Sequence, residues 1–182
     1  MRHVTARDGT ALFTSDWGRG PEVVFVHSWG VQAQMWHYQA SFLLERGYRT
    51  VSYDRRGRGR SDEPGAGYDY DSLADDLAAV IAGRDLHDVT LVGHSMGCGE
   101  IVRYLSRHGN GRVARVVLVA PSMPRLVKSP DNPDGVDESV FEGMRALWQR
   151  DYPKWLADNA PPFFTRETSA EMMPRACCSA HR

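Results

Sequence analysis

The chain has 182 residues, enough for one sizeable hydrophobic core, and its 42% hydrophobic and 25% charged content is ordinary for a globular protein. With 22 basic and 23 acidic residues the net charge is −1, so nothing in the charge balance suggests nucleic acid or an acidic membrane as a partner. The N-terminus lacks the apolar region of a signal peptide and no apolar run reaches the ~20 residues of a membrane span, which favours a cytoplasmic protein.

The first half of the chain alternates short strand-like runs with an amphipathic segment. Residues Val4–Trp17, with Asp8-Gly9 between two short runs, predict an antiparallel hairpin at a sheet edge. A continuous apolar run, Val23–Val26, is typical of a buried strand. Trp36–Arg46 predicts a helix, and Thr50–Tyr53 predicts the next strand.

The alternation continues to residue 119. We expect Asp71 or Ser72 to cap a helix whose buried face holds Leu73, Leu77, Val80 and Ile81. The strand Val89–Val92 follows, then a helix that ends at His108-Gly109 and turns Ile101, Val102 and Leu105 inward, then the strand Val113–Val119. This order predicts an α/β fold with a mostly parallel sheet and helices on both faces.

After Pro121 prolines interrupt the chain repeatedly, and apolar residues fall on short helical stretches. We therefore divide the chain into a core (residues 1–121), a cap that shapes a substrate pocket (122–173) and an atypical tail (174–182). The three cysteines, Cys98, Cys177 and Cys178, have neither a disulfide pattern nor zinc-site spacing, so no metal is expected.

Ser95 is the strongest candidate for a chemical role. It lies in Gly93-His94-Ser95-Met96-Gly97, directly after a strand-like run and before an amphipathic helix. A sharp turn of this kind holds a serine out of the backbone as a nucleophile, and it needs small residues on both sides of the serine. The serine also needs a general base. We expect His94 to be a packed residue behind the turn, because adjacent side chains on such a turn diverge.

A nucleophilic serine is usually accompanied by an oxyanion hole of two backbone N–H groups. One should come from the residue after the nucleophile, here Met96. The other should come from the loop that follows the strand Val23–Val26, and we assign it to Trp29. His27, in the same loop, suits a structural hydrogen bond better than the role of general base.

Three segments together resemble the α/β-hydrolases. They are Phe25–Gly30, Tyr53–Ser61 and Gly93–Gly97. Further blocks resemble, more narrowly, the cofactor-free haloperoxidases and their arylesterase relatives: Gly99-Glu100 with Arg103-Tyr104, Arg112–Ala114, and Lys128–Val136 with Asn132–Gly135. The resemblance covers nearly all of residues 1–173.

The resemblance implies an α/β-hydrolase fold, here without its last strands, and hydrolysis of a small-molecule carboxylic ester through an acyl-enzyme. It also implies perhydrolysis, in which peroxide replaces water and yields a peracid that oxidises halide. No metal, haem or other cofactor is implied. Two residues depart from the family pattern: Ser28 and Cys98 stand where glycine is usual. Ser28 would alter the oxyanion loop, whereas Cys98 is expected to be a small packed residue.

No triad acid or base can be assigned. In this family the acid and the histidine follow the cap, in the order Ser, Asp, His. After Ser95 the chain has only His108, which we expect at a solvent-facing helix end, and His181, which has no strand before it. The aspartates beyond Pro121 occur in cap-like sequence; they are Asp131, Asp134, Asp137 and Asp158.

The ending from Pro174 to Arg182 does not resemble the family. We interpret it as a truncation or frameshift near Met173; the alternative is a genuine short variant with a disordered tail. Two functions from different classes remain open: an impaired serine esterase, or a non-catalytic remnant or binding module that uses the cap pocket.

Overall fold

A computed structural model describes residues 2–123 and 125–169 of the chain. These residues fall into two compact units that meet in sequence at Met123. The predicted tail, with His181 and the cysteine pair at 177 and 178, lies outside the described residues. None of the described helices is long and apolar enough to cross a membrane.

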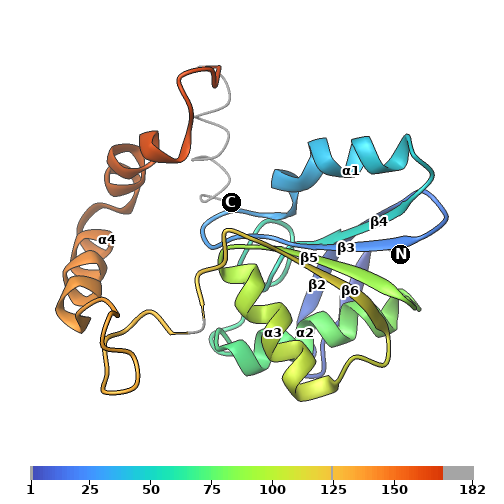
Figure 1. Cartoon of the computed structure of the whole chain (residues 1–182), viewed down its shortest axis with the longest axis horizontal. Helices are drawn as coiled ribbons and strands as arrows, with labels where there is room; N and C mark the ends of the chain where they lie inside the picture. The colour runs from blue at the N-terminus through green and yellow to red at the C-terminus, as the bar shows by residue number, and fades with distance from the viewer. Residues whose placement is uncertain (1, 124, 170–182) are drawn as a thin grey trace. The chain divides into compact units, whose positions relative to one another are not determined.

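The first unit is built on a six-stranded sheet of order β1-β2-β4-β3-β5-β6 (Figure 1). Its strands are β1 (His3–Thr5), β2 (Ala11–Trp17), β3 (Glu22–Val26), β4 (Arg49–Tyr53), β5 (Val89–His94) and β6 (Val113–Val119). The last four named pair in parallel, whereas β1 and β2 add an antiparallel hairpin at the edge, with Val4 opposite Leu12. The predicted mostly parallel sheet and its edge hairpin are therefore confirmed.

Helices cover both faces of this sheet, as predicted. They are the short 3₁₀ helix η1 (Ala33–Trp36), α1 (His37–Leu44), α2 (Tyr70–Gly83) and α3 (Met96–His108). Figure 1 shows α1 on one face, with α2 and α3 on the other. The larger apolar core lies under α2 and α3, and a smaller cluster of Val23, Phe25, Trp36 and Ala40 lies under α1.

Two local expectations were wrong. The cap of α2 is Asp69, whose carboxylate accepts the N–H groups of Asp71 (2.9 Å) and Ser72 (3.0 Å); its extended backbone is what a capping residue requires. Val102 faces solvent at 38% exposure, because it lies about 100° around α3 from the buried Ile101. The helix expected from Trp36 to Arg46 is present as the eight-residue α1, which η1 precedes.

The strand order sets the position of the site. From β3 the chain moves to β4 on one side, and it returns past β3 to β5 on the other side. The loops that leave β3 and β5 therefore diverge toward opposite faces, and ligands of open α/β sheets bind at such a switch point. Val26 pairs with Gly93, which places the loop after β3 directly beside Ser95.

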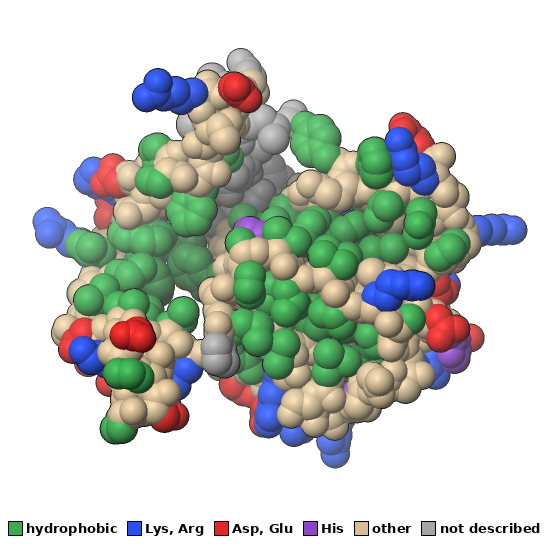
Figure 2. Space-filling model, in the orientation of Figure 1, with side chains coloured by type: hydrophobic (Ala, Val, Ile, Leu, Met, Phe, Trp, Pro, Cys, Tyr) green, Lys and Arg blue, Asp and Glu red, His purple; other side chains and the backbone are tan. Residues whose placement is uncertain are grey.

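The last strand of the described sheet, β6, presents an apolar surface. Its Val116, Val117, Leu118 and Val119 are 37% to 45% exposed, although all are large apolar residues. Figure 2 shows apolar side chains gathered on the face of the first unit where β6 lies in Figure 1. An edge strand with this composition is a known template for further pairing.

The second unit consists of a turn-rich segment and a long helical segment that non-helical backbone at Asp151 divides into two shorter helices, in line with the short helices expected. Asn132 closes the turn segment by donating to the carbonyls of Arg125 (2.9 Å) and Val127 (3.1 Å). Asp137 caps α4 (Glu138–Asn159), which is kinked at Asp151, two residues before Pro153; the 3₁₀ helix η2 (Pro161–Phe163) follows. Three aromatic rings at the kink pack on one another; they belong to Trp148, Tyr152 and Trp155.

Candidate active site

Ser95 lies on a strained turn between β5 and α3. Its φ is 52° and its ψ is −115°, a combination that side-chain-bearing residues rarely adopt. Such strain costs about 1–3 kcal/mol and persists only where the surroundings enforce it, commonly at functional sites. The sequence motif placed Ser95 between a strand and a helix, and the structure has it there.

The two glycines of the motif are required by close contacts. A Cβ on Gly97 would lie 2.6 Å from the carbonyl oxygen of Val26 and 2.8 Å from that of His27. A Cβ on Gly93 would lie 2.8 Å from a methyl group of Ile101 and 2.9 Å from the backbone of Gly97. Glycine thus lets the first turn of α3 contact the end of β3, which joins the Ser95 turn to the loop after β3.

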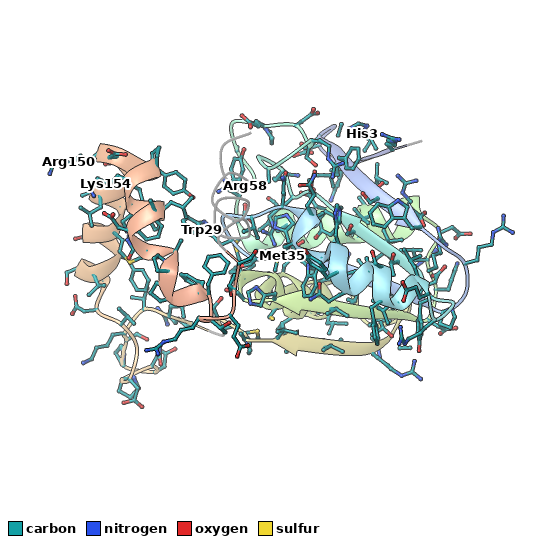
Figure 3. All side chains as sticks on the ribbon, turned by 90° about the horizontal axis from the view of Figure 1, so that it is seen from above. His3, Trp29, Met35, Arg58, Arg150 and Lys154 are labelled. Atoms are coloured by element: carbon teal, nitrogen blue, oxygen red, sulfur yellow. The ribbon has the colours of Figure 1, made fainter. Side chains whose placement is uncertain are left out.

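That loop, residues 27–32, holds Trp29 and ends where η1 begins. Trp29 is 40% exposed, and the N–H of the preceding Ser28 donates to Sδ of Met35 at 3.5 Å. Trp29 lies beyond the carboxyl ends of the strands (Figure 3), whereas Met35 packs against the cluster of Val23, Phe25, Trp36 and Ala40. The loop and the first turn of α3 therefore bring the two sequence-assigned oxyanion donors, Trp29 and Met96, to the same edge of the sheet.

Ser95 is also joined to the end of β6. Its N–H donates to the carbonyl of Val119 at 3.0 Å, and its Oγ lies 3.4 Å from Oγ of Ser122. Between them Ala120 has a φ of 43°, so a second strained residue lies at this edge of the sheet. Cys98 is fully buried and donates its thiol to the carbonyl of Gly93 at 3.2 Å, which fits the small packed residue expected there.

His27 is buried and both of its ring nitrogens are engaged. Nε2 accepts the backbone N–H of Arg55 at 3.0 Å, so Nδ1 carries the proton and donates it to the carbonyl of Ser28 at 2.8 Å. Burial, reinforced by the charge of Arg55, holds the pKa of His27 well below its usual 6.5. A neutral ring with both nitrogens occupied has a structural role, as the sequence suggested.

The other histidines near the motif contact groups other than Ser95. His94 packs edge-on against Trp36 with ring centroids 6.5 Å apart, and burial lowers its pKa. His108 ends α3, about 20 Å along the helix from Ser95, and its Nε2 lies 2.7 Å from a carboxylate oxygen of Asp75. Within the described ranges no histidine hydrogen-bonds to Ser95, and His181 is outside them.

The aspartates weighed as triad acids lie in the second unit and have local partners. Asp131 accepts from Ser129 at 2.6 Å, Asp137 caps α4, and Asp158 pairs with Lys154 at 2.8 Å. Asp134 lies in the turn segment before α4. None of the four follows a strand of the sheet, so the structure adds no reason to assign any of them to a triad.

The neutral state of His27 makes the fold sensitive to acid. The unfolded ring binds a proton below about pH 6.5 but the folded ring does not, so stability is complete above that pH and is lost as the pH falls. We expect this one residue to cost about 1.4 kcal/mol of unfolding free energy per pH unit below 6.5. Urea unfolding between pH 8 and 5.5 gives the free energy of unfolding at each pH, and this should fall less steeply with decreasing pH in His27→Asn than in the wild type. An equal pH dependence in the two proteins would contradict a buried, neutral His27.

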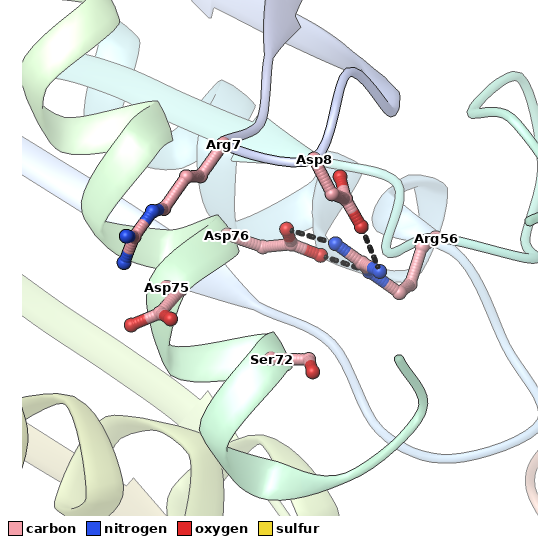
Figure 4. A pocket seen from close by; sticks show the side chains of 6 residues that line it. All are labelled: Arg7, Asp8, Arg56, Ser72, Asp75 and Asp76. Carbon is pink, nitrogen blue, oxygen red and sulfur yellow. Dashed lines mark hydrogen bonds and ion pairs between the residues drawn. The ribbon is translucent and has the colours of Figure 1, made fainter. Parts of the chain in front are cut away.

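A charged pocket of about 330 Å³ lies elsewhere in the first unit. It is lined by Arg7, Asp8, Arg56, Ser72, Asp75 and Asp76 (Figure 4). Arg56 is nearly buried there and donates to both carboxylate oxygens of Asp76 at 2.6 Å and to Asp8 at 2.8 Å. None of these residues belongs to the Ser95 turn or to loop 27–32. The ion pairs of Arg56 join the β1–β2 turn to α2, so these charged side chains have a structural role.

A family model for the α/β-hydrolase fold matches residues 21–174. The chain belongs to this family. The match includes the turn at Ser95 and the loop after β3, so the α/β-hydrolase resemblance of the sequence motifs is confirmed, as is the fold class predicted from them.

Individual α/β-hydrolases agree with the narrower resemblance. The chain is 48% identical over 165 residues to a non-heme haloperoxidase of Rhodococcus erythropolis, and 40% identical over 167 residues to a bifunctional esterase/perhydrolase of Acinetobacter calcoaceticus. Each match covers 90% of this chain and 60% of the relative, so the chain spans about 60% of their length. An esterase from Exiguobacterium antarcticum superposes with a TM-score of 0.93 at 33% identity, covering 98% of this chain and 66% of that one.

Proposed function

We propose that this α/β-hydrolase chain carries the nucleophile and oxyanion hole of a serine esterase that acts on small carboxylic esters. The observation that carries the proposal is the strained φ of Ser95 at the switch point of the sheet, with loop 27–32 beside it. The esterase and haloperoxidase relatives support the same chemistry. A perhydrolase side activity is supported by the relative from Acinetobacter calcoaceticus, which is named a bifunctional esterase/perhydrolase.

In the proposed reaction Ser95 Oγ attacks the ester carbonyl carbon and its proton passes to a general base. The N–H groups of Met96 and Trp29 stabilise the oxyanion, the carbon–oxygen bond to the alcohol breaks, and the alcohol leaves with that proton. Water then cleaves the acyl-enzyme to give the acid, or hydrogen peroxide cleaves it to give the peracid. No cofactor takes part in this scheme.

The general base is the part of the scheme that the described residues leave open. The hydroxyl of Ser122 lies 3.4 Å from Ser95 Oγ, and a hydroxyl is a poor proton acceptor. His27 has both nitrogens engaged, and His108 lies at the far end of α3. The lack of an assigned base favours a second candidate function for the chain: a non-catalytic binding module in which Ser95 is held on the turn but has no base to deprotonate it.

Labelling with a fluorophosphonate tests whether Ser95 is the nucleophile. We expect slow labelling that maps to Ser95, is abolished in Ser95→Ala and is retained in Ser106→Ala, which removes an exposed serine of the same helix. Turnover of p-nitrophenyl acetate should be at most a trace, because loss of the base alone costs about 10⁶ in kcat in subtilisin. Labelling that persists in Ser95→Ala would refute the assignment, and brisk Ser95-dependent turnover would show that a base is present and make His181 the next residue to test.

A further inference from the structure

Loop 27–32 is held at both ends by two consecutive residues that follow β4. At its start, the backbone N–H of Arg55 donates to Nε2 of His27, and Nη2 of Arg55 donates to the carbonyl of His27 at 2.8 Å. At its end, Oδ1 of the fully buried Asp54 accepts the N–H of Ala33 at 2.9 Å. The path of the loop that carries Trp29 is therefore fixed by the turn after β4.

Arg55 is in turn held by the helix that carries the nucleophile turn. Its Nε and Nη2 lie 2.8 and 2.7 Å from Oε2 of Glu100, which is on α3, five residues after Ser95. The hydroxyl of Tyr53 donates to the other oxygen of Glu100. The side chains of Glu100 and Arg55 are 0% and 6% exposed, so the ion pair is shielded from solvent.

We propose that Glu100 is a positioning residue which, through Arg55 and His27, fixes the oxyanion donor of Trp29 relative to Ser95. This inference rests on the proposed function. Three elements contribute to the connection, and each contact in it is a hydrogen bond or an ion pair between buried groups: α3 holds Glu100, the turn after β4 holds Arg55, and the end of β3 holds His27. Neither Glu100 nor Arg55 touches the reacting atoms in this scheme.

An oxyanion hole tolerates little displacement of its donors, which is why Trp29 needs a positioning residue. Its donors must lie within hydrogen-bond reach of a point defined by the nucleophile, and a displacement of about 1 Å costs about 10²-fold in rate. Trp29 is on a loop, which by itself does not provide such precision. If Glu100 loses its charge, the buried guanidinium of Arg55 is left without its counter-ion and cannot keep its position. His27, and the loop with it, then lose their anchor.

The chain offers a matched control in the next residue. Arg56 forms an equally buried ion pair with Asp76, whose side chain is 0% exposed, but this pair is joined to the β1–β2 turn through Asp8 and not to loop 27–32. Glu100→Gln and Asp76→Asn therefore both remove one buried negative charge opposite a buried arginine. Both variants should be destabilised, and only the first should disturb the loop.

The experiment compares these two variants by two readouts in the full chain. The first is the rate at which diethyl pyrocarbonate modifies His27, with the 60% exposed His87 as the internal reference. We expect His27 to be protected in the wild type, about tenfold more reactive in Glu100→Gln and unchanged in Asp76→Asn. The second is the rate of Ser95 phosphonylation by a fluorophosphonate, which should fall by about 10²-fold in Glu100→Gln and stay near the wild-type rate in Asp76→Asn.

Equal effects of the two variants on both readouts would overturn the proposal, because Glu100 would then contribute stability alone. A wild-type His27 as reactive as His87 would also overturn it. If Ser95 is not labelled in the wild type but the His27 contrast between the variants is observed, the anchoring of the loop stands and the proposed function fails. If Glu100→Gln does not fold, Tyr53→Phe removes one hydrogen bond to Glu100 and should change both rates in the same directions, and no change in that variant would count against the proposal.

Discussion

Joining residues 1–173 of this chain to the remaining C-terminal portion of the Rhodococcus erythropolis haloperoxidase should raise Ser95-dependent ester hydrolysis by at least about 10³-fold over the chain alone. The described residues supply a strained serine and a loop beside it, but no histidine that contacts Oγ. The relative extends well beyond the matched region, which covers 60% of its length. Within the family the acid and the histidine follow the cap, so the added portion would supply the base.

The measurement is the rate of p-nitrophenyl acetate hydrolysis and, in a second assay, of peracid formation from acetate and hydrogen peroxide. The same chimera with Ser95→Ala is the control and should lose the gain in both assays. A folded, soluble chimera without Ser95-dependent activity would contradict the esterase proposal. Ser28 would then be examined first through Ser28→Gly, because it stands in the oxyanion loop where the family usually has glycine.

Substituting Gly97 by alanine should destabilise the first unit by about 1–3 kcal/mol or more, although alanine favours a helix by about 1 kcal/mol over glycine. The added Cβ would lie 2.6 Å and 2.8 Å from two backbone carbonyl oxygens of β3 and its loop, and these atoms cannot rotate away. Overpacking therefore outweighs helix propensity. The shift that relieves the contact would also separate Ser95 from the oxyanion loop, so Ser95 labelling should fall as well.

Urea unfolding of Gly97→Ala and Gly111→Ala provides the comparison. A Cβ on Gly111 would have no neighbour within 4 Å, and its φ is not in the left-handed region. Gly111→Ala should therefore be neutral or stabilising by less than about 1 kcal/mol. If Gly97→Ala unfolds at the same urea concentration as the wild type, the contact between α3 and the end of β3 is not as close as described.

Local sequence determined the elements and the place of Ser95, the proposed nucleophile. The apolar runs of β3, β5 and β6 and the amphipathic faces of α2 and α3 each have a period that can be recognised within one segment. The motif around Ser95 is also local, because its glycines are needed within two residues of the serine. His27 was expected to be structural from its place in the loop after β3, and Cys98 was expected to be a small packed residue at a position where the family usually has glycine.

Only the tertiary structure decided how these parts act together. Arg55 and Glu100 fall in two separate segments that resemble the family, yet they form a buried ion pair between residues 45 positions apart. Asp69, not Asp71 or Ser72, caps α2. Several polar residues near the start of the helix could act as the cap, and the direction from which the chain enters the helix decides which of them does. Ion pairs, caps and solvent-facing positions such as Val102 depend on which elements pack together, and composition and periodicity do not encode that choice. The sequence thus determined the strained turn at Ser95, whereas the packing of β3, the turn after β4 and α3 determined what holds loop 27–32 beside it.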